Sequence, residues 1–304
     1  MMNITRILCP VDFSDASQHA LEQATVVAGW FGAPITLLHV YTQVFLPVPG
    51  MAVAGYGSDF VLGVEDRQRL FEDASRWADS ARAAGVHVDV VVEVGQAIPH
   101  IFSTAAATHA DLIVLGTHGA SGFEHLLLGS VTEKVLRKAP CPVLTVPPRA
   151  HNMSALPFKK ILVAVDFSES SLAALGAALS VAQEADAQLT ILHVLDWPEP
   201  EAMPANVDVA ASGVFDLEGY RRVLEAEAST RLSTLVPDDA RQWCTPVTQV
   251  AHGKPYREIL KVAAGMDLVV LGIRGRNALD LMLFGSTANQ VVRQATCPVL
   301  TVSH

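Results

Sequence analysis

Residues 7–40 read ILCPVDFSDASQHALEQATVVAGWFGAPITLLHV, and residues 161–194 read ILVAVDFSESSLAALGAALSVAQEADAQLTILHV. The two stretches align without a gap, and half of their positions are identical. Further on, GTHGASGFEHLLLGS at 116–130 matches GIRGRNALDLMLFGS at 272–286, and CPVLTV occurs at 141–146 and at 297–302. Two long copies indicate a duplicated domain, because solenoids stack many short repeats. We therefore predict domains at 1–147 and 158–304, joined by an exposed linker at 148–157.

Within each copy, short apolar runs rich in β-branched residues alternate with longer amphipathic stretches. The runs predict strands at 6–11, 35–40, 86–94, 111–116 and 141–146, and again at 160–165, 189–194, 245–251, 267–272 and 297–302. Stretches such as 14–31 and 64–85 space apolar residues by three and four, as one face of a helix requires. Strands that are apolar on both faces need helices on both sides. The fold class is therefore α/β, with two tandem doubly wound domains that each hold a five-stranded parallel sheet.

The segments at 44–63 and 196–215 are the least regular part of each copy. Both are rich in proline, glycine and alanine. We expect loops there, either lids over a ligand or apolar surfaces that pack against the other domain, and the sequence leaves both interpretations open.

Composition excludes several classes of function. The formal net charge of −10 argues against a sequence-independent grip on nucleic acid, which needs Lys and Arg along an extended surface. No uninterrupted apolar run reaches the roughly 18–20 residues of a membrane-spanning helix. The four cysteines show no zinc spacing, so we expect small buried thiols, and without a recognisable signal segment we expect a cytoplasmic protein.

The turn after the first strand reads VDFS in both copies, with Asp12 and Asp166 at equivalent positions. Ligands of an open doubly wound sheet bind outside the carboxyl ends of the strands, where the strand order reverses. These aspartates are therefore candidate ligand contacts. An aspartate here can equally cap the next helix, a role open also to Ser14 and Ser168.

A glycine pattern follows the fourth strand of each copy. It runs Gly116, Gly119, Gly129, Ser130 in the first copy and Gly272, Gly275, Gly285, Ser286 in the second. Glycine allows close backbone approach, and Gly-Ser opens a helix whose free N–H groups attract an anion. Tight turns alone could also explain the glycines. Neither G-x-x-x-x-G-K-[ST] nor G-x-G-x-x-G is present, which argues against a P-loop NTPase and a dinucleotide-binding Rossmann domain.

The aspartate after the first strand and the G-2x-G-9x-G-[ST] pattern after the fourth resemble the ATP-binding branch of the universal stress protein family. The resemblance covers nearly the whole chain, twice. It implies the strand order 3-2-1-4-5 of adenine nucleotide alpha hydrolase-like folds, and ATP as ligand, with the presence of Mg²⁺ left open. The implied ATP contacts in the first copy are Pro10, Val11, Asp12 and Val40 for adenine, Gly116, His118 and Gly119 beside ribose and phosphates, and Gly129, Ser130, Val131 and Thr132 for the phosphate tail. Those in the second copy are Ala164, Val165, Asp166, Val194, Gly272, Arg274, Gly275, Gly285, Ser286 and Thr287.

The two implied sites differ in one hydroxyl. Where the first copy has Thr132 the second has Ala288, so only the first can offer this hydroxyl to a phosphate or its metal. Arg274 and Arg276 supply charge to the second site instead. We expect the first site to bind ATP better. Of the histidines, only His118 has an expected functional role, and the others are expected at strand ends or on the surface, because their spacing fits no metal site.

The glycine segments hold no lysine and no evident catalytic base, so we predict no efficient catalysis, at most slow ATP hydrolysis or autophosphorylation. The leading hypothesis is a nucleotide-responsive protein of stress adaptation, with no protein partner identified. A weak ATP or phosphate-ester hydrolase and a nucleotide-independent chaperone-like scaffold are the alternatives. The resemblance also implies that the last strands of the two domains pair inside one chain, and it leaves a homodimer open.

Overall fold

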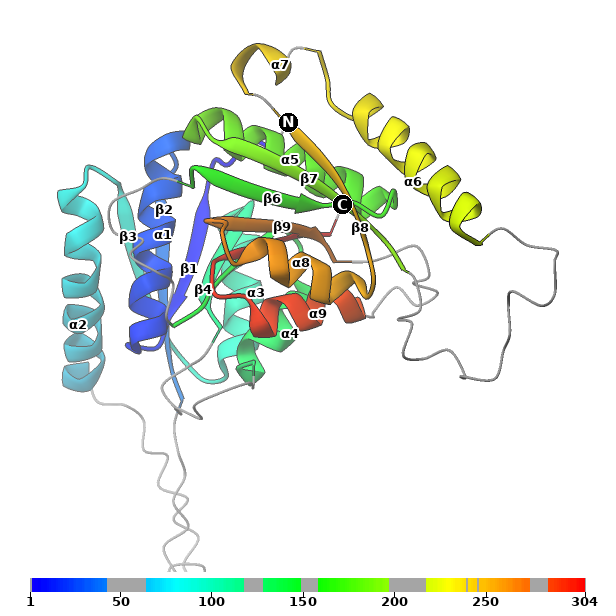
Figure 1. The fold of residues 1–304 in the computed structure, drawn as a ribbon. Coiled ribbons are helices and arrows are strands. Elements are labelled where there is room, and N and C mark those ends of the chain that lie inside the picture. The colour runs from blue at the N-terminus through cyan, green and yellow to red at the C-terminus, as the bar shows by residue number, and fades with distance from the viewer. Residues whose placement is uncertain are drawn as a thin grey trace, which may run out of the picture.

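The chain folds into a large α/β protein (Figure 1). The computed structural model describes residues 2–42, 64–117, 128–148, 158–196, 217–238, 240–244, 246–273 and 284–303. The expected loop at 44–63 lies outside the described residues, and so does all of 196–215 after its first residue. Most of the predicted linker lies outside them as well.

The two halves contain the same order of elements. The first half consists of β1 (Ile7–Val11), α1 (Asp15–Phe31), β2 (Ile35–Tyr41), α2 (Val64–Ala83), β3 (Val88–Val94), α3 (Ala97–Ala107), β4 (Leu112–Gly116), α4 (Ser130–Lys138) and β5 (Val143–Val146). The second consists of β6 (Lys160–Ala164), α5 (Glu169–Ala185), β7 (Gln188–Leu195), α6 (Leu217–Thr234), α7 (Ala240–Trp243), β8 (Val247–His252), α8 (Pro255–Ala263), β9 (Leu268–Gly272), α9 (Ser286–Gln294) and β10 (Val299–Val302). All ten predicted strands are present, and the short helix α7 is an addition that the sequence did not predict.

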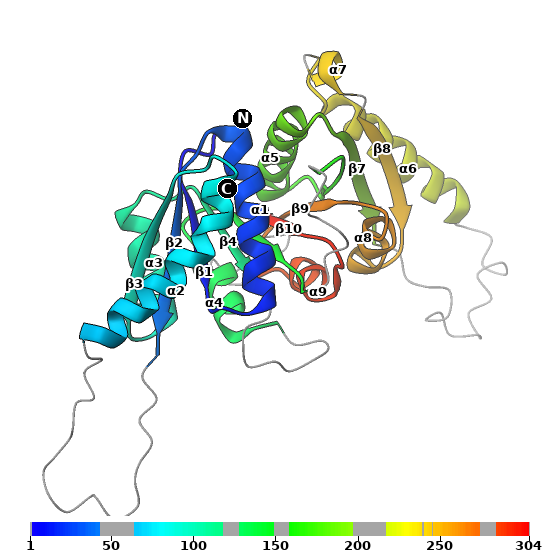
Figure 2. The same cartoon turned by 90° about the vertical axis from the view of Figure 1, so that its left-hand side faces the viewer.

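The strands form one ten-stranded sheet in the order β3-β2-β1-β4-β5-β10-β9-β6-β7-β8. Counted within each half, this order is 3-2-1-4-5, and the strands of each half are parallel. The two halves do not form separate parallel sheets. They are joined by the antiparallel pair of β5 and β10, in which Leu144 lies opposite Leu300. Thr145 and Thr301 each donate a side-chain hydrogen bond of 3.1 Å to a carbonyl of the facing strand. Figure 2 shows the two halves side by side around this joint.

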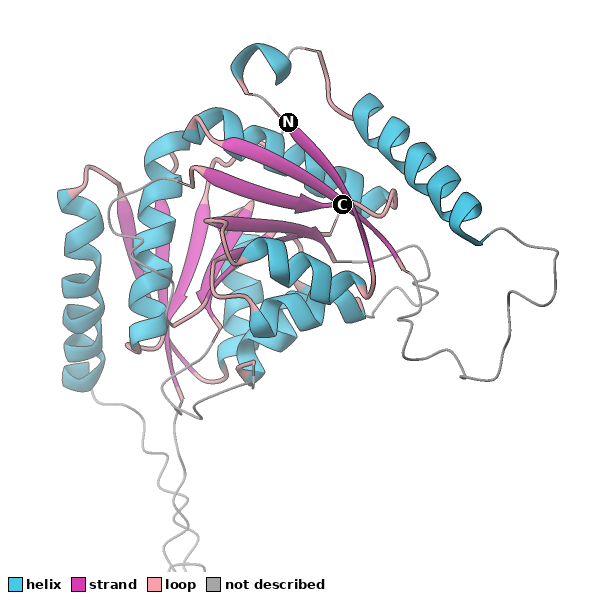
Figure 3. Cartoon of the chain, viewed as in Figure 1, coloured by secondary structure: helices cyan, strands magenta, loops and turns pink. Residues whose placement is uncertain are grey.

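Helices cover both faces of the sheet, as Figure 3 shows. Successive residues of a strand point to opposite faces. In β1, Ile7 and Cys9 therefore join a core with α1 and α2, whereas Leu8 joins a second core with α3 and α4. Both cores continue into the second half of the chain. No helix in the described part of the chain is long and apolar enough to cross a membrane.

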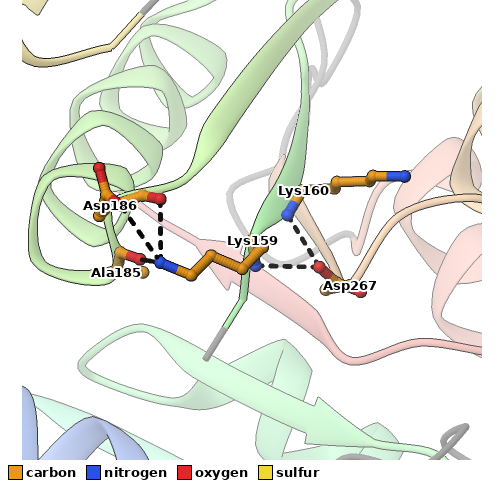
Figure 4. A network of polar contacts seen from close by, with 5 residues as sticks. All are labelled: Lys159, Lys160, Ala185, Asp186 and Asp267. Carbon is orange, nitrogen blue, oxygen red and sulfur yellow. Dashed lines mark hydrogen bonds and ion pairs between the residues drawn. The ribbon is translucent and has the colours of Figure 1, made fainter. Parts of the chain in front are cut away.

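A carboxylate in each half fastens the end of the sheet opposite to the candidate site. In the second half Asp267 accepts hydrogen bonds from the backbone amides of Lys159 and Lys160, at 2.9 and 2.8 Å, while the Lys159 ammonium reaches the carbonyl of Ala185 at 2.7 Å at the end of α5 (Figure 4). In the first half Asp111 accepts from the amides of residues 5 and 6 in the same way. These contacts fix the amino ends of the strands. The candidate site lies at the opposite edge of the sheet, at the carboxyl ends.

Candidate functional site

The candidate site lies where β1 and β4 run side by side. These parallel strands pair directly with each other. In the sheet, β1 also pairs with β2 on its other side, and β4 pairs with β5 on its other side. In the second half β6 and β9 occupy the same positions. The turn after β1 and the segment after β4 therefore start from adjacent strand ends, which is the switch point at which doubly wound sheets bind ligands.

The VDFS turn is a small hydrogen-bonded unit in both halves. Asp12 Oδ1 accepts from the Ser14 amide at 3.2 Å and from the Ser14 hydroxyl at 2.5 Å. Ser14 in turn caps α1 by accepting from the Ser17 amide. Asp166 and Ser168 repeat these contacts before α5, at 3.0 and 2.5 Å. The serines are thus the helix caps, and the aspartates orient them while standing at the mouth of the switch point.

Phe13 and Phe167 in this turn have left-handed backbone conformations, with φ of 62° and 65°. A bulky residue rarely adopts such a φ, and it does so only when its surroundings over-determine it. In the first half the Phe13 ring lies 4.3 Å from the His39 ring, and Trp77 of α2 meets Phe13 edge-on at 5.2 Å. In the second half Phe167 lies 4.6 Å from His193, and the Arg231 guanidinium lies 4.0 Å above Phe167. Stacked side chains therefore hold the strained turn in both halves.

His39 and His193 join these stacks to the main chain of the first strands. His39 Nδ1 donates to the Val11 carbonyl at 3.0 Å, and His193 Nδ1 donates to the Val165 carbonyl at 2.7 Å. Both histidines are buried at the strand ends, not exposed on the surface. This role of the two histidines was not predicted from the sequence. The signal was their recurrence in LLHV and ILHV, together with the repeated phenylalanine of the turn.

Gly116 and Gly272 end the strands β4 and β9 for a reason of packing. A Cβ added at Gly116 would lie 2.9 Å from the backbone of Ala16 in α1. At Gly272 a Cβ would lie 2.7 Å from the backbone of Ser170 and Ser171 in α5. The first glycine of each pattern is therefore required for helix-to-strand packing, apart from any contact with a ligand.

The helices α4 and α9 begin at the Gly-Ser that ends each glycine pattern. Gly129 and Gly285 are their N-caps, with φ of −56° and ψ of 140° and 139°, and neither offers a side-chain cap. Ser130 and Ser286 are the first helical residues and are exposed. The first N–H groups of a helix lack partners within it and carry the positive end of its dipole. In both halves these N–H groups make the helix start a candidate anion site.

Thr132 has a partner that the sequence did not indicate. Its hydroxyl donates to the Gly116 carbonyl at 2.8 Å, and the residue is only 4% exposed. At the equivalent position Ala288 is 3% exposed. The difference between the halves that the sequence showed is therefore a difference in how α4 and α9 are attached to the sheet.

The remaining predicted contacts lie partly outside the described residues. His118, Gly119, Arg274 and Gly275 are not described. Six others lie at the strand ends or in the first turns of α4 and α9, and all six are half-buried: Pro10, Val40, Val131, Ala164, Val194 and Thr287. Val165 is buried.

The thiols of the described residues are poor nucleophiles. Burial raises the pKa of Cys9 to about 12, and it does the same for Cys141 and Cys297, with some help from Asp111 and Asp267 respectively. A thiol of such pKa stays protonated at neutral pH, and the thiolate is the reactive form. In the described part of the chain no three His, Cys, Asp or Glu side chains are grouped to hold a metal ion.

The fold and the site define a class of protein: a tandem pair of doubly wound domains, each with an uncapped helix start beside an aspartate turn. The universal stress protein family model matches residues 3–147 and again residues 157–303. The chain belongs to the universal stress protein family.

Similar proteins match this chain either over nearly its whole length or over one half of it. Universal stress protein Rv2005c of Mycobacterium tuberculosis is 27% identical over 303 residues, which cover 97% of this chain and 95% of that protein. Universal stress protein YxiE of Bacillus subtilis is 35% identical over 147 residues, 48% of this chain and 99% of its own length. Among solved structures, a universal stress protein from Archaeoglobus fulgidus superposes with a TM-score of 0.65 at 23% identity, over 99% of both chains. This structural likeness shows the fold.

Proposed function

We propose that this chain binds ATP at the switch point of its first half and acts as a nucleotide-responsive regulator in stress adaptation. The observation that carries the proposal is the uncapped start of α4 at Gly129 and Ser130, at the same sheet edge as the Asp12 turn. Phosphate oxygens are well suited to main-chain N–H groups at a helix start. The glycine pattern resembles that of the ATP-binding branch of the family, which favours an adenine nucleotide as the bearer of that phosphate.

In this proposal each part of the nucleotide meets a different part of the site. The main chain around Pro10 and Val11, the Asp12 carboxylate and the Val40 backbone would hold adenine. The exposed Ser130 hydroxyl and the first amides of α4 would hold the phosphate tail. Magnesium usually keeps several waters and binds through substrate phosphates, so it needs no cage of protein carboxylates here.

The site has groups that bind but no described group placed as a catalyst. The Asp12 carboxylate accepts two hydrogen bonds from Ser14. It is therefore engaged in holding its own turn. Efficient phosphoryl transfer needs a positioned base or water and strong charge on the terminal phosphate. We propose that bound nucleotide acts chiefly through the shape of the protein, with hydrolysis slow.

A substitution at each helix start tests the proposal. In Gly129→Asp the new carboxylate would cap α4 and accept the N–H bonds that the phosphate needs, so the helix is stabilised while ATP is repelled. Gly285→Asp does the same in the second half. We expect Gly129→Asp to weaken the binding of Mg-ATP by at least about tenfold without lowering the melting temperature.

Native mass spectrometry of the purified protein gives the number and mass of bound nucleotides, and calorimetry with Mg-ATP gives the affinity. Gly285→Asp should leave the tighter site intact. The proposal fails if wild-type protein carries no adenine nucleotide and Mg-ATP neither binds nor raises the melting temperature. Unchanged affinity in Gly129→Asp would place the nucleotide elsewhere.

A further inference from the structure

Two hydrogen bonds close the base of the glycine segment in the first half. The Gly129 amide donates to the Thr117 carbonyl at 2.8 Å. The Thr132 hydroxyl donates to the Gly116 carbonyl, also at 2.8 Å. The last residue of β4 and the residue after it are thus each tied to the beginning of α4.

Gly116 is itself held from the other side. It packs so closely on the backbone of Ala16, in the first turn of α1, that a Cβ would not fit. The Thr132 hydroxyl therefore connects α4 to a point at which β4 already touches α1. The starts of both helices that border the switch point are fixed to the same residue. Their relative position decides whether the aspartate turn and the free amides of α4 face one ligand together.

A threonine hydroxyl has one proton to donate. In this structure the Thr132 proton is directed to Gly116, and the side chain is buried. The N–H groups of α4 remain as donors to an anion at the helix start. We infer that Thr132 is a positioning residue of the first site, which sets the phosphate-binding helix against the sheet instead of donating to a phosphate. This inference rests on the proposed function.

The second half lacks this hydroxyl and keeps the other closure. The Gly285 amide donates to the Ile273 carbonyl at 2.9 Å, as Gly129 does to Thr117. Ala288 has no hydroxyl to reach Gly272, although both residues occupy the equivalent positions. With one closure instead of two, α9 is set less firmly against β9. The inference therefore predicts that a hydroxyl at 288 would strengthen the second site.

The test exchanges the hydroxyl between the halves. Thr132→Val keeps the shape and removes the donor, and Thr132→Ser restores the donor. Both are made with Gly285→Asp, so that only the first site is measured. Ala288→Ser and the larger Ala288→Thr are made with Gly129→Asp, which isolates the second site. The smaller serine guards against overpacking at a buried alanine.

Calorimetry would compare Mg-ATP with adenosine, which lacks the phosphates. We expect Thr132→Val to weaken Mg-ATP by about five- to tenfold, the value of one hydrogen bond, and to leave adenosine nearly unchanged. Thr132→Ser should retain most of the affinity. Ala288→Ser or Ala288→Thr should tighten Mg-ATP at the second site by about threefold or more.

Hydrogen exchange of the ligand-free protein separates positioning from direct contact. If Thr132 positions α4, the hydrogen-bonded amides of residues 133–136 exchange faster in Thr132→Val before any nucleotide is added. In the wild type the equivalent amides of residues 289–292 exchange faster than those of 133–136. If the hydroxyl is instead a phosphate ligand, exchange without nucleotide is unchanged, and the inference is overturned.

A lower melting temperature with unchanged affinity, or an equal loss for Mg-ATP and adenosine, also overturns it, because either result shows a role in general stability. Failure of the proposed function gives a different result. In that case the wild type, Gly129→Asp and Gly285→Asp bind neither compound, whatever the exchange rates.

Discussion

The two halves have the same backbone geometry at the candidate site and differ in the side chains that hold this backbone in place. Phe13 and Phe167 have nearly the same left-handed φ, and Gly129 and Gly285 have nearly the same φ and ψ. The fastening groups have diverged, with Trp77 in the place of Arg231 and Thr132 in the place of Ala288. Duplication has thus kept two candidate sites of one backbone geometry. In the proposal made above, the residues that border each site set its affinity.

The largest expected effect tests what the halves share, the glycines at the ends of β4 and β9. Gly272→Ala would push a Cβ to 2.7 Å from α5 backbone atoms, and Gly116→Ala to 2.9 Å from those of α1. Backbone cannot move aside cheaply, so we expect Gly272→Ala to lower the free energy of unfolding by about 3 kcal/mol and Gly116→Ala by about 2 kcal/mol. Urea denaturation measures both.

Each half offers a matched control for this prediction. Gly29 in α1 and Gly176 in α5 are helical glycines with open space where a Cβ would go. Alanine there should raise the free energy of unfolding by about 0.5–1 kcal/mol, since it favours the helix. If Gly116→Ala and Gly272→Ala proved as harmless as these controls, the glycines would have to be explained by a ligand and not by packing.

The next effect tests a difference between the halves. Trp77 is half-buried in the core and meets Phe13 edge-on, so Trp77→Ala should lower the free energy of unfolding by about 2–3 kcal/mol. Arg231 is exposed above Phe167, and Arg231→Ala should cost about 0.5–1 kcal/mol. Denaturation of the two variants side by side gives the comparison. Equal losses would mean that the two stacks hold the turn equally well.

The sequence was sufficient for the fold because its signal is repeated and local. Apolar runs of strand length and amphipathic stretches are read directly from the residues, and the aligned repeat showed that both halves follow one plan. The aspartate turn and the helix starts at Ser130 and Ser286 were predicted for the same reason. What the repeat left undetermined was how the two sheets join, because an antiparallel pair of β5 and β10 depends on tertiary contacts between residues far apart in the chain.

The sequence did not indicate which partner each polar group selects. Thr132 was expected to face a phosphate, but three-dimensional packing brings the Gly116 carbonyl within 2.8 Å of its hydroxyl. His39 looked like an ordinary strand-end histidine until the left-handed turn placed Phe13 against its ring. Such contacts are set by backbone torsions and tertiary proximity, which residue types alone do not encode.

The smallest expected effect concerns the contact between α4 and α9. Glu133 lies 3.8 Å from Arg137 of its own helix and 3.8 Å from Arg293 of the second half. The arginines occupy equivalent positions, but the counterpart of Glu133 is Asn289. One carboxylate therefore pairs with two guanidinium groups, one in its own helix and one in the other half of the chain. Partly exposed ion pairs contribute little, so we expect Glu133→Gln to lower the free energy of unfolding by less than about 1 kcal/mol.

Asn289→Glu would complete the symmetry by giving α9 a carboxylate of its own, and we expect a gain of a few tenths of a kcal/mol, about the value of one exposed pair. Both effects should shrink as ionic strength rises from about 0.01 M to about 1 M, since the Debye length falls from about 30 Å to about 3 Å. Urea midpoints of the two variants at both salt concentrations make the measurement. A loss in Glu133→Gln that persisted in high salt would show that Glu133 acts through packing at the joint. That result would make the joint between the halves, like the glycines of β4 and β9, a matter of shape more than of charge.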